Sequence, residues 1–193
     1  MQDFLLPKPN VTIGEIFERG ACMRIREATG EDAEGIAKVH VDSWRTTYKN
    51  ILPSDFLERL SYTQRKESWI KNISRDGNYV FIAEDHDGQI VAFADGGKRE
   101  GNHVDHSGDL TSIYVLEKFQ GMGIGKKLVK QLFSKFADLE YRIIFVEVLE
   151  DNKSRYFYDS LGAELLKTEQ IKISGKELNL LVYQWKDIRT LGL

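Results

Sequence analysis

The sequence is poor in cysteine and proline and has no long apolar run. Among 193 residues there is one cysteine, Cys22, and three prolines. A single cysteine excludes an internal disulfide and is typical of a reducing compartment, so we expect a cytoplasmic protein. No stretch approaches the ~18–20 apolar residues of a membrane span, and the opening MQDFLLPKPN lacks the pattern of a secretion signal. We therefore expect no membrane partner.

An excess of basic residues is also absent. Lysine and arginine number 27 against 30 acidic residues, which gives a formal net charge of −3 and a pI of about 5.9. Nucleic-acid binders usually carry a basic excess, so we expect no nucleic-acid partner. His103 and His106 lie three positions apart in a polar stretch without a cysteine or carboxylate constellation. The sequence therefore predicts two solvated histidines and no metal site.

The pattern of apolar residues predicts one domain that mixes strands and helices. A chain of this length normally forms a single domain, here residues 23–187. Residues 1–22 fall outside the pattern and form either a mobile tail or a short helix started by the capping box Thr12–Glu15. Strands are predicted at 23–29, 79–85, 90–96, 110–115, 142–149 and, as a final pair around Ser-Gly-Lys, 170–185. Helices are predicted within 31–44, 53–73, 125–139 and 152–162, and a loop at 96–109.

One turn is unusually rich in glycine. The stretch SIYVLEKFQGMGIGKKLVKQLF (Ser112–Phe133) places Gly121, Gly123 and Gly125 between a predicted strand and a predicted helix. The free N–H groups and the dipole of a helix start attract anions, and glycine lets a phosphate approach the backbone. Two lysines follow at once. The turn either binds a phosphate group or is a tight turn without a ligand.

The spacing of these glycines excludes two common phosphate motifs. A P-loop would need glycine at Gln120 and serine or threonine at Lys127, and the dinucleotide fingerprint needs a different glycine spacing. The pattern Gln120-x-x-Gly123-x-Gly125 instead resembles the acetyl-CoA signature of the GCN5-related N-acetyltransferase (GNAT) superfamily. EDNKSRYFYDSLGAE, with Asn152 and Tyr158, resembles the next motif of that family, and VHVDSWRTTYKNILP resembles its first-helix region.

The resemblance implies a fold and a co-substrate. The fold is a mixed α+β acyl-CoA N-acyltransferase fold, with a strongly twisted mixed sheet of about seven strands and about four helices. Two parallel strands in the middle of that sheet would part to hold the pantetheine arm of acetyl-CoA. The residues implied to bind acetyl-CoA are Ile113, Tyr114, Val115, Gln120, Gly121, Met122, Gly123, Ile124, Gly125, Lys126, Asn152 and Tyr158.

The resemblance also implies catalytic roles. A backbone N–H at Val115 would face the thioester. Tyr158 would be the general acid, since a phenol with a pKa of about 10 is protonated at neutral pH and can donate to the departing thiolate. The alternative is that Tyr158 is only an aromatic residue of the core. Tyr156 or Phe157 could be that core residue instead. Asn152 could bind the pantetheine arm, cap the following helix, or do both.

The base and the acceptor are less defined by the sequence. The amine must lose a proton before it attacks. Asp109 is our first candidate for the base that accepts this proton, and Asp95 and Glu84 are further candidates. Asp42, Trp44 and Tyr48 are candidates for the acceptor side, where acids and aromatics suit a cationic amine. Cys22 lies outside the fold pattern, so we expect no covalent enzyme intermediate.

These observations predict an acetyl-CoA-dependent N-acetyltransferase that acts on a small-molecule or peptide amine by direct attack in a ternary complex. One alternative is a non-catalytic acyl-CoA binding or sensing module of the same fold. A second is a P-loop-like nucleotide-binding protein, which the missing serine or threonine disfavours. Relatives of this kind often dimerise, so a homodimer is possible.

Overall fold

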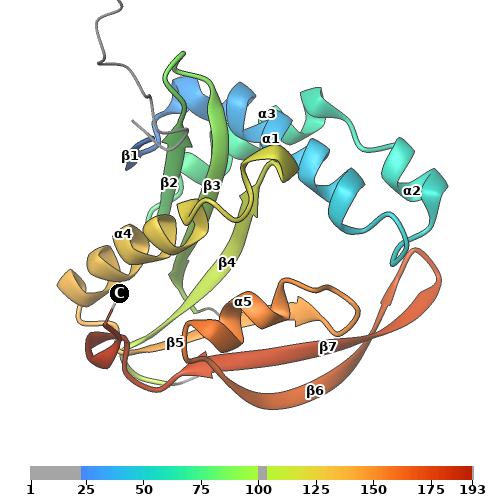
Figure 1. Ribbon diagram of the computed structural model, residues 1–193. Helices are drawn as coiled ribbons and strands as arrows, with labels where there is room; N and C mark the ends of the chain where they lie inside the picture. Colours follow the sequence, from blue (N-terminus) through green and yellow to red (C-terminus); the bar gives the residue numbers. More distant parts are fainter. Residues whose placement is uncertain (1–22, 100–103, 193) are drawn as a thin grey trace, which may run out of the picture.

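The computed structural model describes residues 23–99 and 104–192. Over these residues the chain forms a seven-stranded sheet and five α-helices (Figure 1). The strands are β1 (Arg24–Glu27), β2 (Asn78–Glu84), β3 (Ile90–Lys98), β4 (Ser107–Val115), β5 (Ile143–Leu149), β6 (Glu164–Ile173) and β7 (Lys176–Trp185). The helices are α1 (Ala33–Thr47), α2 (Ser54–Glu58), α3 (Tyr62–Ile73), α4 (Ile124–Asp138) and α5 (Arg155–Ser160). The predicted extension 1–22, including Cys22, lies outside the described residues.

The sheet is divided at its centre. Its strand order is β1-β2-β3-β4-β5-β7-β6, and every neighbouring pair is antiparallel except β4 and β5. These two strands run parallel and pair only through Ser107–Asp109 and Ile143–Phe145. Beyond Asp109 they part, as Figure 1 shows. The predicted mixed sheet with two parted parallel strands is confirmed.

The two faces of the sheet carry different helices. Helix α4 packs on one face with an apolar core that includes Leu110, Leu132 and Trp185. Helices α1 and α3 pack on the other face, where Trp69 and Phe93 are fully buried (Figure 1). No described helix is long and apolar enough to cross a membrane.

One helix prediction needs correction. The stretch 53–73 forms two helices, α2 and α3, so the described residues contain five α-helices where about four were expected. The break lies before Ser61, whose extended backbone (φ −103°, ψ 126°) and side-chain oxygen, accepting from the N–H of Gln64, begin α3. Serine is a common helix-capping residue for this reason.

The loop predicted at 96–109 is wrong at both ends. Strand β3 continues to Lys98, and β4 already begins at Ser107. The glycines mark close contacts inside the sheet: a Cβ at Gly97 would lie 2.0 Å from the carbonyl oxygen of Gly77, and one at Gly96 would lie 2.1 Å from that of Asp109. A β-bulge accompanies them, because the β3–β4 register shifts between Asp95 and Gly96. Glycine inside a strand often marks such a bulge.

Candidate active site

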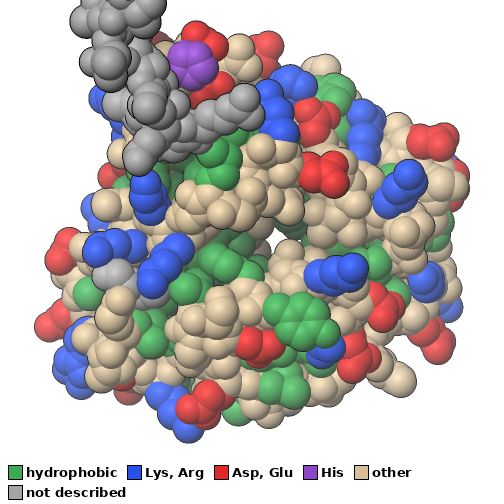
Figure 2. Space-filling model, in the orientation of Figure 1, with side chains coloured by type: hydrophobic (Ala, Val, Ile, Leu, Met, Phe, Trp, Pro, Cys, Tyr) green, Lys and Arg blue, Asp and Glu red, His purple; other side chains and the backbone are tan. Residues whose placement is uncertain are grey.

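A cavity of about 830 Å³ lies at the parted strands. It is lined by the end of β4, the glycine turn, the start of α4, the start of α5 and the segment after α1. On the face that carries α4 and α5, Figure 2 shows a hollow near the middle with hydrophobic side chains on its wall. Its lining residues include Thr46, Lys49, Asn50, Ile51, Ile113, Val115, Phe119, Gln120, Gly121, Gly123, Ile124, Gly125, Lys126, Asn152, Ser154, Phe157 and Tyr158.

The glycines of the turn have two different roles. Gly121 and Gly123 adopt left-handed φ angles of 76° and 75°, and a Cβ on either would meet no atom within 4 Å. Gly123 is the N-cap of α4, so the free N–H groups of the helix start border the cavity beside Lys126. Gly125 is instead a packing residue, since a Cβ there would lie 3.2 Å from the ring of Phe157. The open backbone at Gly121 and Gly123 is suited to a phosphate group.

Gln120 fixes the turn to the strand that precedes it. Its side-chain amide donates to the carbonyl oxygen of Val115 at 3.0 Å, and its own N–H donates to the carbonyl of Glu117. Ile113 and Val115 line the cavity and also pack against the core on the α4 face. Gln120 therefore positions the turn relative to β4.

Tyr158 and Asn152 also line the cavity, from α5 and the segment just before it. Tyr158 is 5% exposed and packs near Tyr183 and Trp185. Burial raises the pKa of its phenol above the ordinary value, so the hydroxyl stays protonated across the neutral range. The side-chain oxygen of Asn152 accepts from the N–H of Ser154 at 2.9 Å at the start of α5. Asn152 also lies beside Tyr48 and lowers the pKa of that phenol, which burial raises.

The neighbouring tyrosine has a different environment. Tyr156 is 57% exposed, and its hydroxyl accepts from the guanidinium of Arg155. It does not line the cavity, whereas Tyr158 does. This difference favours Tyr158 for the position of the family tyrosine.

Other polar groups lie on the opposite face of the sheet, on the side that α1 covers. Tyr114 points away from the cavity toward α1 and packs near His40 and Phe93. Its hydroxyl lies 3.3 Å from that of Tyr48, at the end of α1, and burial raises the pKa of Tyr114. The ring of Trp44 packs against that of Tyr48 in a tilted arrangement, with 4.9 Å between the ring centres. Tyr114 was predicted to bind the co-substrate, and the structure places its side chain on the α1 side.

The candidate bases differ in access. Asp109 is the last residue of β4 that pairs with β5, and its side chain is 28% exposed and ion-paired with Arg99. Asp95 is 3% exposed, bonded to the hydroxyl of Ser112, and burial raises its pKa to about 7. Glu84 pairs with Arg26 at 2.5 Å, away from the cavity. Asp109 lies where the strands part and is more exposed than Asp95, but it is not among the residues that line the cavity.

One residue predicted to bind the co-substrate, Met122, is 42% exposed and does not line the cavity.

Other residues of the site had no clear signal in the sequence. Thr46, Lys49 and Asn50 line the cavity, although only their place in the stretch VHVDSWRTTYKNILP pointed to them. Arg99 and Glu147, which flank Asp109, lie 48 positions apart and were not predicted.

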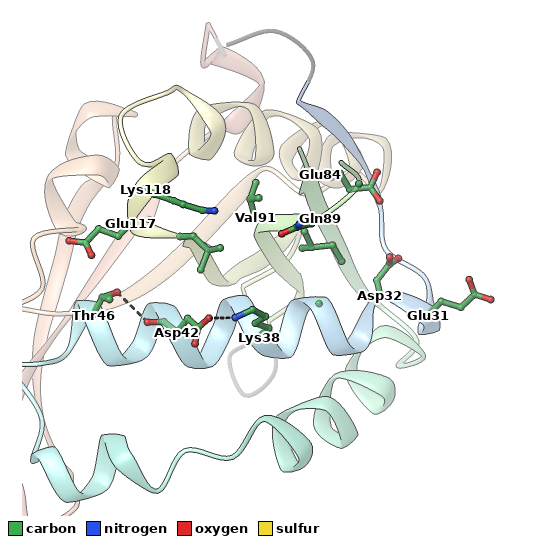
Figure 3. Close-up of a pocket in the computed structure, with 14 residues that line it drawn as sticks. Glu31, Asp32, Lys38, Asp42, Thr46, Glu84, Gln89, Val91, Glu117 and Lys118 are labelled. Atoms are coloured by element: carbon green, nitrogen blue, oxygen red, sulfur yellow. Dashed lines mark hydrogen bonds and ion pairs between the residues drawn. The ribbon is translucent and has the colours of Figure 1, made fainter. Parts of the chain in front are cut away.

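A second cavity of about 710 Å³ runs along α1 (Figure 3). Its carboxylates are largely paired: Asp32 with Arg26 at 2.7 Å, and Asp42 with Lys38 at 2.8 Å. Asp42 also accepts from the hydroxyl of Tyr62. This cavity shares Thr46 and Glu117 with the first but contains neither the glycine turn nor Tyr158. Asp42 and Glu84 therefore belong to a separate groove.

Within residues 23–99 and 104–192, one cluster of side chains could bind a metal ion. Asp85, His86 and Asp87 lie together in the turn between β2 and β3. Asp85 there accepts from the backbone N–H groups of Asp87 and Gln89, as turn residues often do. Of the two histidines predicted to be solvated, His106 is exposed and His103 lies outside the described residues. The absence of a metal site stays a prediction.

Comparisons with known proteins agree with this geometry. The acetyltransferase (GNAT) family profile matches residues 40–163. The uncharacterized N-acetyltransferase YuaI of Bacillus subtilis is 36% identical over 167 residues, which cover 86% of this chain and 95% of YuaI. The chain therefore belongs to the GNAT family of acetyltransferases.

Solved structures of acetyltransferases share the fold. The ribosomal-protein-alanine N-acetyltransferase of Brucella melitensis matches with a TM-score of 0.69 and 28% identity, covering 84% of this chain and 99% of that one. The PaiA N-acetyltransferase of Thermoplasma acidophilum, solved in complex with coenzyme A, matches with a TM-score of 0.66 and 18% identity, covering 86% and 99%.

Proposed function

We propose that this protein transfers the acetyl group of acetyl-CoA to a primary amine by direct attack in a ternary complex. The observation that carries the proposal is the cavity at the parted strands, which brings the glycine turn and Tyr158 together although they lie far apart in sequence. Family membership supports acetyl transfer, and the cavity supports the choice of co-substrate.

The residues of the cavity fit acetyl-CoA. The open backbone of Gly121 and Gly123, the start of α4 and Lys126 suit a pyrophosphate. The edges of β4 beyond Asp109 and of β5 beyond Phe145 have no strand partner toward each other, so their backbone groups are free to bond an extended chain. When bound, acetyl-CoA supplies the acetyl group as a thioester.

We assign the two proton transfers to Asp109 and Tyr158, whose side chains lie on opposite faces of the sheet. Asp109 accepts the proton that the amine must lose, directly or through water. Tyr158 holds a proton that it donates to the sulfur as the thiol leaves. The bulge gives the backbone a third role: Leu110 pairs with Gly96 and Ser112 with Asp95, so Thr111 has no register partner. We assign to the backbone N–H groups there and at Val115 the stabilisation of negative charge on the acyl oxygen.

The acceptor is a small-molecule or peptide amine. The test is a panel of both kinds, with released thiol as the readout, and a peptide with an N-terminal alanine is included because of the Brucella relative. At least one amine should be acetylated, with the product confirmed by mass. If acetyl-CoA binds but no amine in the panel is acetylated, the non-catalytic acyl-CoA binding module becomes the better interpretation.

Substituting Tyr158 tests its role as general acid. Tyr158→Phe keeps the ring in its packing and removes the proton donor, so kcat should fall about 10²-fold, the low end for general acids, because a thiolate leaves tolerably unprotonated. The KM for acetyl-CoA should change less than about threefold. The matched control Tyr156→Phe, on an exposed ring, should keep kcat within about twofold. A silent Tyr158→Phe alongside a crippling Tyr156→Phe would reverse the assignment.

A further inference from the structure

The divided sheet has a side-chain link at the point where its halves separate. Strands β4 and β5 are joined by the pairs Ser107–Ile143 to Asp109–Phe145 only. Arg99 follows directly after β3 and reaches across this junction. Its guanidinium donates to Asp109 on β4 through Nη1 and to Glu147 on β5 through Nη2, the latter at 3.4 Å.

The same guanidinium rests on an aromatic ring of the second half. Its central carbon lies 4.4 Å from the centre of the Phe145 ring. The side chain of Arg99 is 14% exposed, against 28% for Asp109 and 48% for Glu147. Arg99 is thus the least exposed of the three charged side chains. A planar guanidinium can bond two carboxylates and stack on a ring at once, which an ammonium cannot.

We propose that Arg99 is a positioning residue for acetyl transfer: it ties β4 to β5 where they part and holds the Asp109 carboxylate in place for the acceptor amine. This inference rests on the proposed function, in which Asp109 is the base. Arg99 itself acts through Asp109. Glu147 is the carboxylate partner of Arg99 on β5, and it adds negative charge beside Asp109.

The charges around Asp109 have opposing effects. Burial raises the pKa of Asp109, the positive charge and hydrogen bond of Arg99 lower it, and the negative charge of Glu147 raises it again. Asp109 must be ionised to accept a proton, so its pKa sets the acid side of the pH–rate profile. Removing Arg99 should move that side to higher pH, and neutralising Glu147 should move it to lower pH.

The experiment compares Arg99→Gln, Arg99→Lys and Glu147→Gln over the acid side of the kcat/KM profile. Arg99→Gln should shift the midpoint to higher pH and reduce kcat/KM at least about tenfold below it. Glu147→Gln should shift the midpoint to lower pH. Arg99→Lys keeps the charge but not the two-sided clasp, so its midpoint should lie nearer that of the wild type. KM for acetyl-CoA should change less than about threefold, because Arg99 does not line that cavity.

Arg189→Gln is the matched control, since Arg189 forms an ion pair with Asp187 near the end of the chain. It should leave the profile unchanged. Midpoints that stay fixed in both Arg99→Gln and Glu147→Gln, or that move in the same direction, would overturn the proposal. If the contacts of Arg99 were only structural, the variants would lose folding stability and activity, but the midpoints of their pH profiles would not move.

A second measurement works without turnover. The carboxyl carbon of Asp109, labelled with ¹³C and identified by its loss in Asp109→Asn, is titrated by NMR in the folded wild type and in the variants. Opposite shifts in Arg99→Gln and Glu147→Gln support the inference even if no amine is acetylated, and identical titrations overturn it. Failure of the proposed function, seen as no acetylation, is thereby distinguished from failure of the role of Arg99.

Discussion

Gly123 provides the sharpest test of the proposed phosphate site. It is the N-cap of α4 with a φ of 75°, and a Cβ there would meet no protein atom within 4 Å. A side chain at this position therefore enters the space beside the turn without a clash. Asp would be strained by about 1–2 kcal/mol in the left-handed conformation, and its advantage over glycine as a helix cap offsets only roughly a few tenths of a kcal/mol of that cost.

The two effects separate folding from binding. Gly123→Asp should fold with a loss of about 1–2 kcal/mol of stability, while its carboxylate occupies the place of the phosphate and repels it. We expect the affinity for acetyl-CoA, measured by calorimetry, to fall at least about tenfold, or about 1.4 kcal/mol. Gly123→Asn, nearly identical in shape but neutral, should lose less, and the difference measures the contribution of charge.

The matched control is Gly77→Asp. Gly77 has a φ of 76° and an equally open surrounding but lies before β2, outside the cavity. It should show the same backbone strain and no loss of affinity. Unchanged acetyl-CoA affinity in a folded Gly123→Asp protein would refute the assignment of the glycine turn as the phosphate site.

Two further predictions concern stability. Gly97→Ala should destabilise the fold by at least about 2 kcal/mol, because its Cβ would lie 2.0 Å from a backbone oxygen, whereas Gly30→Ala, in open space, should stay within about 1 kcal/mol, both measured by denaturant unfolding. Burial lowers the pKa of His40 from 6.5 to about 3, so the stability contributed by its neutral form is complete above pH 6.5 and is lost as the pH falls toward 3. His40→Gln should remove this slope, at most about 1.4 kcal/mol per pH unit; a slope that persists would contradict the buried neutral histidine.

Much of the fold followed from local patterns. The hairpin was predictable because Asp87-Gly88 falls between two apolar strands, and Gly88 indeed takes a φ of 76° there. The helix after the glycine turn was predictable from the spacing of Leu128, Leu132 and Phe136, all fully buried. In each case the signal lies within a few residues of the structure that it specifies.

The error in the loop and the missed ion pair arose where the decisive contact is distant in sequence. Gly97 resembled a loop residue because its close neighbour, the carbonyl oxygen of Gly77, belongs to another segment. The pairing of Arg99 with Glu147 spans 48 positions and left no local pattern. The cavity was foreseen only through motif resemblance, since neither the glycine turn nor Tyr158 indicates by itself that the other is near.

The two-sided arrangement follows from where β4 and β5 separate. Up to Asp109 the strands share hydrogen bonds and the sheet is closed; beyond it, the free edge of β4 borders the cavity on the α4 face. Alternation along the strand then sends Ile113 and Val115 to the cavity on the α4 side and Tyr114 to the α1 side. The bulge at Thr111 sets this alternation, because without it every side chain from Ser112 onward would exchange faces. A single extra residue in β4 therefore determines which side chains of this strand line the cavity and which face α1.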